Sequence, residues 1–351
     1  METSDPVFHS IDLDNMKGLE IGPLYRPRVS QAYDVRYVDH YSTEELRAGY
    51  AVNSVAGPFI DEIVEVDYVL RDGETIASVT KEDAPFDYVV ASHVIEHVVD
   101  PISWLRDVHE VLAPEGVISL VIPDKRFCFD VNRDLTSFPD WVDWYLRCLE
   151  APSYAQVFDF FANVTTIDGA VDTAALWAGT ADYSNVRRGD VADPDSDAFA
   201  ACLKHRETGE HKDLHAGVYT PESFLGLLRI AMKLELLEFE VAHFESTPIN
   251  TLEFYVTLRR TPQGPVDSSL NSVDKALAAS RRAHGPPAPP CGAPSLVADT
   301  SMPVASDGSQ LTILSRKEQR LIVLKRTILA RLRNQRTTDD ITQMSGKATK
   351  S

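Results

Sequence analysis

Residues 86–122 read FDYVVASHVIEHVVDPISWLRDVHEVLAPEGVISLVI. The segment begins with one continuous apolar run, residues 86–91, and ends with another, residues 117–122. Between them, Asp100 and Pro101 form a strong helix start, because the Asp side chain can accept free N–H groups and Pro fits the first helical position. A strand, a helix and a second strand in this order predict a parallel α/β unit with a right-handed crossover.

The same apolar pattern recurs on both sides of this unit. Runs before it predict strands at residues 17–22, 35–38 and 63–70. Runs after it predict strands at residues 237–244 and 252–258, and their short connection predicts an antiparallel pair. Continuous runs are typical of a parallel sheet covered on both faces. The predicted fold class is therefore α/β: a doubly wound, Rossmann-like, mostly parallel sheet with an antiparallel terminal strand pair.

Composition divides the chain of 351 residues, whose net charge is −19, into an acidic and a basic part. Residues 1–260 carry a net charge of −25 and hold all the predicted strands, whereas residues 261–351 carry +6. Within the first part we expect residues 126–218 to be an insertion of helices and loops that faces the substrate. Residues 261–310 hold 8 of the 21 prolines, which predicts a flexible linker with a brief helix at residues 269–283.

A basic amphipathic helix is predicted at residues 311–336, which contain eight basic residues and one acidic residue. Its apolar stripe consists of Leu321, Leu324, Ile328 and Leu332. We expect this helix to mediate oligomerisation or to contact an anionic partner or a membrane surface, with residues 337–351 as a disordered tail. The sequence does not determine the oligomeric state. The acidic domain itself disfavours nucleic acid, which is bound through Lys and Arg.

Cysteine usage and the N-terminus predict a cytoplasmic protein. The cysteines are Cys128, Cys148, Cys202 and Cys291, with no CxxC pair, so neither a zinc motif nor a disulfide framework is indicated. The N-terminus lacks a basic and then apolar signal peptide, and no apolar run reaches the roughly 18 residues that span a bilayer.

Residues 18–27, GLEIGPLYRP, are arranged like a nucleotide-binding loop. Glu20 lies in the first strand, and Gly22 in the turn lets the backbone approach a ligand. Asp39 ends the second strand, where an acidic residue is the usual partner of ribose hydroxyls. Because GxGxxG is absent, the loop is a poor site for a pyrophosphate. A cationic, phosphate-free nucleoside suits it better.

At these residues the chain resembles the class I S-adenosylmethionine-dependent methyltransferases, in particular the methyltransferase type 11-like group. The resemblance rests on LEIGP at 19–23, YVDHY at 37–41, FDYVVASHVIEHVVDP at 86–101 and LAPEGVISLVIPD at 112–124. It implies S-adenosylmethionine as the cofactor and transfer of its methyl group to a small-molecule or saccharide acceptor. The alternative is a non-catalytic binding or scaffold module with a partner-docking tail. A nicotinamide-dependent oxidoreductase is a weaker option, because GxGxxG is missing.

The resemblance also implies roles for single residues around the cofactor. Glu20 and Gly22 match the motif that holds the methionine portion, and Asp39 matches the residue that binds the ribose. The adenine is expected in the loop before the fourth strand, where Asp83 is the candidate polar group.

The fourth strand supplies residues for both the cofactor and the reaction. Ser92 and His93 match positions that line the cofactor and the methyl-transfer site. A neutral acceptor needs a general base, and His93 or His97 is predicted for this role, since imidazole titrates near neutral pH. The alternative for His97 is a structural role at the start of a helix.

Two groups of charged residues are candidate substrate contacts: Asp124, Lys125 and Arg126 after the fifth strand, and His211, Asp213 and His215 in the insertion. The alternative for each is an ordinary solvated or hydrogen-bonded loop. In an extended segment alternate residues share one face, so the three residues of HxDxH can converge. A set of two His and a carboxylate can bind iron or zinc. Nothing else in the sequence indicates a metal enzyme, so we predict no metal.

Overall fold

The computed structural model describes residues 5–51, 57–166, 171–181, 183, 186–209, 213–261 and 266–284. The chain divides into two compact units, Met1–Ala288 and Pro289–Ser351, and all the described residues belong to the first. The predicted basic helix at 311–336 and the predicted tail at 337–351 lie outside the described residues.

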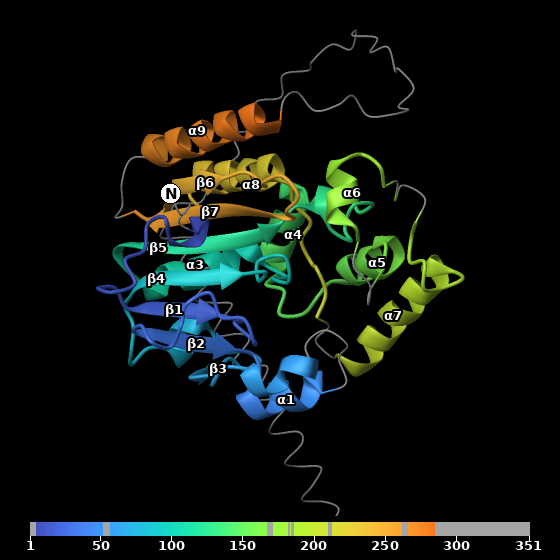
Figure 1. The fold of residues 1–351 in the computed structure, drawn as a ribbon, viewed down its shortest axis with the longest axis horizontal. Helices are drawn as coiled ribbons and strands as arrows, with labels where there is room; N and C mark the ends of the chain where they lie inside the picture. The colour runs from blue at the N-terminus through green and yellow to red at the C-terminus, as the bar shows by residue number, and fades with distance from the viewer. Residues whose placement is uncertain are drawn as a thin grey trace, which may run out of the picture. The chain divides into compact units, whose positions relative to one another are not determined.

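A seven-stranded sheet in the order β3-β2-β1-β4-β5-β7-β6 forms the centre of the first unit (Figure 1). Its strands are β1 Gly18–Ile21, β2 Val35–Asp39, β3 Tyr68–Val69, β4 Phe86–Ser92, β5 Leu112–Pro123, β6 Phe239–Glu245 and β7 Glu253–Arg260. The first five strands are parallel, and β7 is antiparallel to both of its neighbours. The predicted mostly parallel sheet with an antiparallel terminal pair is therefore confirmed.

One predicted strand is much shorter than expected. Residues 63–70 contain only the two-residue β3. The backbone N–H of Val64 donates to the carbonyl of Leu24, and that of Val66 donates to the hydroxyl of Thr43. These residues therefore bond to a loop and a helix start instead of a neighbouring strand.

The described helices include one that begins at the predicted start signal Asp100-Pro101 and one that begins at the similar pair Thr220-Pro221. They are α1 Thr43–Tyr50, α2 Ile76–Val79, α3 Pro101–Val111, α4 Phe138–Arg147, α5 Tyr154–Asn163, α6 Thr173–Trp177, α7 Pro194–Thr208, α8 Pro221–Lys233 and α9 Val266–His284, with 3₁₀ turns η1 Pro6–Phe8, η2 Gly57–Glu62 and η3 Lys125–Phe127. The Asp100 carboxylate caps α3, and the Thr220 hydroxyl caps α8. None of the described helices is long and apolar enough to cross a membrane.

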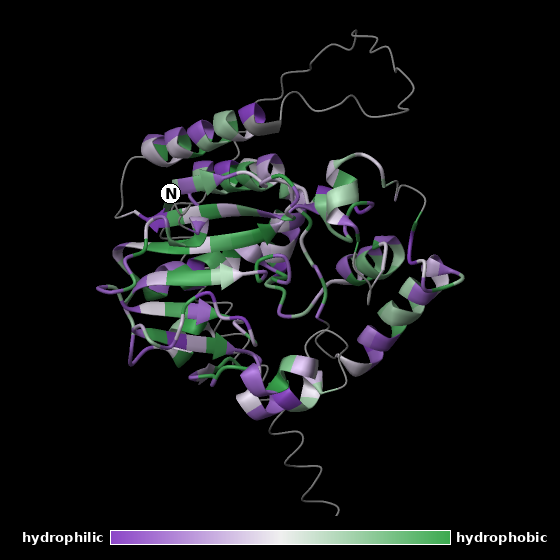
Figure 2. Ribbon diagram, in the orientation of Figure 1, coloured by the Kyte–Doolittle hydropathy of each residue, from purple (hydrophilic) through white to green (hydrophobic). Residues whose placement is uncertain are grey.

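Helices cover one face of the sheet. Leu105 of α3, Phe224 of α8 and Ile118 of β5 are fully buried in one apolar cluster. The hydropathy colouring shows apolar residues concentrated on the central strands and on parts of these helices (Figure 2). This core holds the parallel strands in place, and with them the edge at which their carboxyl ends lie.

The helix α9 corrects the predicted domain boundary at residue 260. Residues 266–284 lie in the predicted linker, yet Val273 is fully buried in the main core and Ala276 is nearly so. An ion pair joins Asp274 to Arg229 of α8, with 2.6 Å between Oδ1 and Nε. Because the surrounding sequence is rich in Pro and Ser, it did not indicate that one face of α9 is apolar and packs in the core of the domain.

No described α-helix contributes to the buried cluster on the opposite face of the sheet. This cluster contains Val7 of η1, Val29 of the β1–β2 loop, Tyr88, Val90 and Tyr255. The hydroxyl of Ser119 in β5 donates to the carbonyl of Val7 at 2.8 Å. The strand order is that of the predicted doubly wound sheet. On this face, however, the N-terminal segment takes the place of a helix.

The predicted insertion at residues 126–218 contains α4 to α7, and Figure 1 shows α5, α6 and α7 beyond the carboxyl ends of β4 and β5. Trp141 and Trp144 of α4 are buried in the main core. Phe160 belongs to a smaller core between α5 and α7 that also includes Val99. These three aromatic side chains are therefore part of the helix core, whereas Phe158 is exposed.

Candidate functional site

Parallel pairing brings the carboxyl ends of four strands to one edge of the sheet. Ile21 of β1 pairs with Val38 of β2 and with Ala91 of β4, and Ser92 pairs with Val121 of β5. The predicted site residues Gly22, Asp39 and Ser92 therefore leave the sheet side by side. In open α/β sheets this edge is where ligands bind.

The Glu20 side chain organises the loop that follows its own strand. It is almost completely buried, and its two carboxylate oxygens accept the backbone N–H groups of Arg28 and Val29 at 2.7 and 2.9 Å. Burial raises the pKa of Glu20 to about 7, although these hydrogen bonds lower it in part. Gly22 has a φ of +64°, a conformation that glycine adopts without strain. Glu20 thus shapes the cradle at the end of β1.

Asp39 keeps a carboxylate at the end of β2. One of its oxygens accepts the backbone N–H of Tyr41 at 3.2 Å. Burial raises its pKa, and repulsion from Asp213 adds to this effect. Buried Glu20 and half-buried Asp39 place two carboxyl groups at this edge, and a bound cation would stabilise their ionised forms. The edge therefore fits a cationic nucleoside such as S-adenosylmethionine.

His93 follows Ser92 and lies between two carboxylates. Its Nε2 lies 2.7 Å from Oε1 of Glu253 in β7, and its Nδ1 lies 3.3 Å from Oε1 of Glu96. Burial alone would lower the pKa of His93, but the hydrogen bond to Glu253 and the nearby Glu96 carboxylate raise it to about 10. Its φ of +55° is uncommon for a residue other than glycine. A protonated imidazole cannot accept a proton, which argues against the predicted role of His93 as general base.

The segment of the predicted HxDxH set lies against the residues after β4. The backbone carbonyl of Glu96 accepts the N–H of Gly217 at 2.8 Å. Oδ1 of Asp213 lies 2.7 Å from Nδ1 of His97, and the His97 and His215 rings pack edge to face with centroids 4.7 Å apart. The structure thus joins Asp213 and His215 to His97.

The pKa of His97 bears on its predicted role as a general base, whereas His211 lies outside the described residues. Burial would lower the pKa of His97, but its interactions with Asp213 and Glu96 raise it, which argues against a general base here as well.

The charged cluster after β5 is largely satisfied by its own neighbours. Asp124 is fully buried, accepts three hydrogen bonds from the Arg126 guanidinium, and accepts the Thr247 hydroxyl at 2.7 Å. Lys125 donates its ammonium group to the carbonyl of Arg133. This arrangement favours the alternative of an ordinary hydrogen-bonded loop over a substrate contact for Asp124 and Lys125.

Asp83 does not lie with the other predicted cofactor residues. Its carbonyl accepts from the ammonium group of Lys17, which directly precedes β1, and its carboxylate accepts the hydroxyl of Tyr68. Because Lys17 precedes a strand that runs parallel to β4, Asp83 lies at the amino-terminal edge of the sheet. This position argues against the predicted contact between Asp83 and the adenine.

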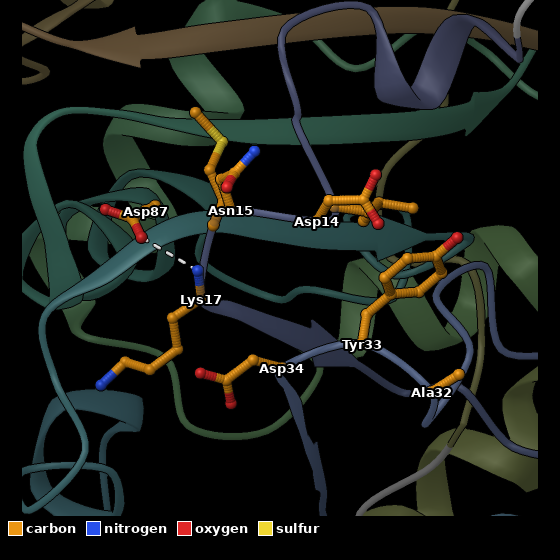
Figure 3. A pocket seen from close by; sticks show the side chains of 9 residues that line it. Asp14, Asn15, Lys17, Ala32, Tyr33, Asp34 and Asp87 are labelled. Carbon is orange, nitrogen blue, oxygen red and sulfur yellow. Dashed lines mark hydrogen bonds between the residues drawn. The ribbon is translucent and has the colours of Figure 1, made fainter.

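A cavity of about 370 Å³ also opens at the amino-terminal edge. Its lining includes Lys17, Asp34 and Asp87, and the backbone N–H of Lys17 donates to Asp87 at 2.9 Å (Figure 3). These residues lie before or at the start of β1, β2 and β4. The cavity is therefore separate from the site at the carboxyl edge.

Sequence reasoning did not select Arg28, Glu253 or Asp130 for the site. Nε of Arg28 lies 3.2 Å from the Ser92 hydroxyl, and an Nη atom lies 3.5 Å from Glu253. Asp130 contacts His215. Arg28 lies in the loop that the sequence did single out, whereas Glu253 and Asp130 have no local signal that distinguishes them.

Comparison with known proteins matches segments of this chain to methyltransferases. Residues 9–165 match the family model described as a methyltransferase domain. The ubiquinone biosynthesis O-methyltransferase of Ruegeria pomeroyi is 33% identical over 75 residues, which are 21% of this chain and 26% of that protein. The matched segment thus spans about a quarter of the length of this relative.

Solved structures with a similar arrangement have low sequence identity. A SAM-dependent methyltransferase of Methanosarcina mazei is 16% identical, with 74% of this chain and 99% of that chain covered and a TM-score of 0.34. A structure described as a putative zinc-dependent alcohol dehydrogenase of Rhodobacter sphaeroides is 10% identical, with coverages of 75% and 91% and a TM-score of 0.38. Similarity at this level does not indicate function.

Proposed function

We propose that this chain, whose residues 9–165 match the model of a methyltransferase domain, is a class I enzyme that transfers a methyl group from S-adenosylmethionine to a small-molecule acceptor. The observation that carries the proposal is the carboxyl edge, where Glu20, Gly22, Asp39 and Ser92 come together in a segment that matches this domain. The O-methyltransferase relative favours an oxygen atom as the acceptor. Saccharides are included in the proposed acceptor class.

The donor side of the site consists of the loops after β1 and β2. The Asp39 carboxylate would accept hydrogen bonds from the ribose hydroxyls, and the backbone around Gly22 would contact the methionine portion. The donor supplies an electrophilic methyl group on a positively charged sulfur. Ionised Glu20 and Asp39 would favour that positive charge near the edge, because their attraction is strong where water is excluded.

The acceptor side consists of the residues after β4 and the insertion. His97 is partly exposed and Asp213 is largely exposed, so both can reach a bound molecule. His93 is held as a cation by Glu253 and Glu96, and it would fix the end of β4 without taking a proton. The chief contribution of these residues is alignment of the acceptor with the methyl group and exclusion of water.

The proposed location remains the cytoplasm. The widely spaced cysteines, without a CxxC pair, are the sequence feature that supports this location.

Calorimetry with S-adenosylmethionine and S-adenosylhomocysteine tests the donor site. We expect both to bind the wild-type chain, and Asp39→Ala to weaken binding by ten-fold or more, since a charge-assisted hydrogen bond contributes about 1.5–3 kcal/mol. Asp34→Ala is the matched control, because Asp34 directly precedes the same strand at the opposite edge and is exposed. No binding to the wild-type chain, or equal losses in both variants, would contradict the proposed donor site.

Transfer of a labelled methyl group in a cell extract tests catalysis. A labelled small-molecule product that forms with the wild-type chain and not with Asp39→Ala is the expected result. Binding without any labelled product would instead indicate the non-catalytic module.

A further inference from the structure

Three side chains beside the donor site have the composition of a metal centre. Glu96, His97 and His215 each offer one ligand atom, and these atoms all lie within 4.8 Å of one another. Glu96 and His97 follow β4, whereas His215 comes from the end of the insertion. The hydrogen bond between the Glu96 carbonyl and Gly217 holds the two segments together.

The Glu96 carboxylate is buried beside the imidazoles of His93, His97 and His215. Its side chain is 1% exposed, and neither oxygen has a hydrogen-bond partner among the described residues. Nδ1 of His93 lies 3.3 Å from Oε1, without the geometry of a hydrogen bond. A buried carboxylate without hydrogen bonds is costly unless an ion or a cation compensates it. Its oxygens are therefore available to a bound cation.

A second carboxylate orients His215 as in metal sites. Nδ1 of His215 lies 2.6 Å from Oδ2 of Asp130, and Asp130 is held by Arg133 through a 2.8 Å ion pair. Asp130 and Arg133 are both buried. A metal-binding His typically donates its other ring N–H to a carboxylate in this way, which fixes the ring and its tautomer. The hydrogen bond to Asp130 leaves Nε2 of His215 free to coordinate.

We propose that Glu96, His97 and His215 bind a divalent transition-metal ion. Two imidazoles and one carboxylate suit Zn²⁺, Fe²⁺ and similar ions, whereas Mg²⁺ and Ca²⁺ prefer oxygen ligands. Zinc lies about 2.0–2.2 Å from each N or O ligand atom, so the three side chains would close around a bound ion. With three ligands from the protein, further coordination positions remain for a water or a substrate atom.

The open coordination positions of the proposed ion would face the carboxyl edge of the sheet. The His97 side chain is 33% exposed and that of Asp213 is 72% exposed, so solvent and ligands reach the cluster from this side. Asp213 also interacts electrostatically with Asp39, which connects the cluster to the donor site. If the proposed function holds, the ion would coordinate an oxygen of the acceptor. This last step rests on the proposed function, whereas metal binding itself does not.

Metal titration of the full chain, without an affinity tag and after removal of bound metal by a chelator, tests the proposal. Zn²⁺ alone is titrated by calorimetry, and Co²⁺ alone gives an absorption spectrum that reports its coordination. We expect one ion per chain and a rise in the thermal midpoint. Glu96→Gln should weaken Zn²⁺ binding by about 100-fold, and Asp130→Asn by about 10- to 100-fold.

His109→Gln is the matched control, since His109 is half-buried in α3 and packs against Phe239 instead of the cluster. Its Zn²⁺ affinity should equal that of the wild type. If Glu96→Gln does not fold, as judged by circular dichroism, His97→Gln at the partly exposed position replaces it. Absence of stoichiometric binding, or equal affinity in the ligand variants and the control, would show an ionic cluster only.

The two proposals fail separately. A chain that binds S-adenosylmethionine and no Zn²⁺ overturns the metal site alone. A chain that binds Zn²⁺ and neither S-adenosylmethionine nor S-adenosylhomocysteine overturns the proposed function and keeps the metal site.

Discussion

Oε1 of Glu20 accepts the backbone N–H of Arg28 at 2.7 Å, so a buried strand residue fixes the loop that passes over it. The Arg28 side chain then extends to the Ser92 hydroxyl at the end of β4 and to Glu253 at the start of β7. One loop residue therefore connects three strands at the carboxyl edge. The position of the donor loop depends on this connection.

The first prediction concerns the pH dependence of stability at Glu20. Burial raises the pKa of Glu20 from 4.5 to about 7, so the folded chain holds this proton more tightly than the unfolded chain. The resulting stabilisation is complete below about pH 4.5 and is lost as the pH rises through about 7. We expect wild type to lose roughly 3 kcal/mol relative to Glu20→Gln between pH 4.5 and 8, as measured by urea unfolding. Parallel pH profiles of the two proteins would contradict this assignment.

The second prediction concerns proton release on donor binding. A cation bound near Glu20 and Asp39 lowers their raised pKa values, so binding near pH 7 should release protons to the buffer. Calorimetry of S-adenosylmethionine in buffers with different ionisation enthalpies measures this release. Glu20→Gln should release fewer protons than wild type, and a binding heat that is independent of the buffer would argue against a cation at this edge.

The third prediction concerns the buried guanidinium of Arg133. It is paired with Asp130 at 2.8 Å and with Asp159 at 2.9 Å. Arg133→Met should destabilise the chain by about 3–5 kcal/mol in urea unfolding, because it leaves a buried carboxylate without its cation. Arg147→Met is the control: its pair with Asp143 is exposed, so the change should be about 0.5 kcal/mol or less. Similar losses in both variants would mean that burial of the pair is unimportant.

The fourth prediction concerns α9. Val273→Ala should cost about 1–3 kcal/mol, since Val273 is fully buried in the main core. Lys275→Ala, on the exposed side of the same helix, should change the urea midpoint little. A chain that ends at residue 288 should unfold at the midpoint of the full chain, whereas one that ends at residue 265 should unfold earlier. Equal midpoints of the two shortened chains would show that α9 is dispensable.

Local signals predicted most of the sheet and its helices. Apolar β-branched runs gave the strands, and Asp100-Pro101 and Thr220-Pro221 gave the starts of α3 and α8. The short β3 was not predictable, because Val64 and Val66 bond to distant backbone and side-chain groups. The buried face of α9 was not predictable, because the surrounding sequence is rich in Pro and Ser. The loop after β1, where a helix is expected, was not predictable either, because the N-terminal segment covers that face of the sheet.

The candidate site was predictable where strand polarity decides position. Gly22, Asp39 and Ser92 all follow or end parallel strands, so they had to reach one edge. Asp83 precedes a strand and therefore lies at the other edge. The contact between His97 and His215 depends on how the insertion folds back, which no spacing in the sequence reveals.

The N-terminal segment has a consequence for the order of assembly. Val7 leaves the ribosome early in synthesis, yet its partners Ser119 and Tyr255 are made much later. The segment must therefore wait, unpaired, until β5 and β7 exist, and this long loop closure slows completion of the sheet. During that interval the back of the central strands stays open, and chaperones have their clearest opportunity to bind the nascent chain.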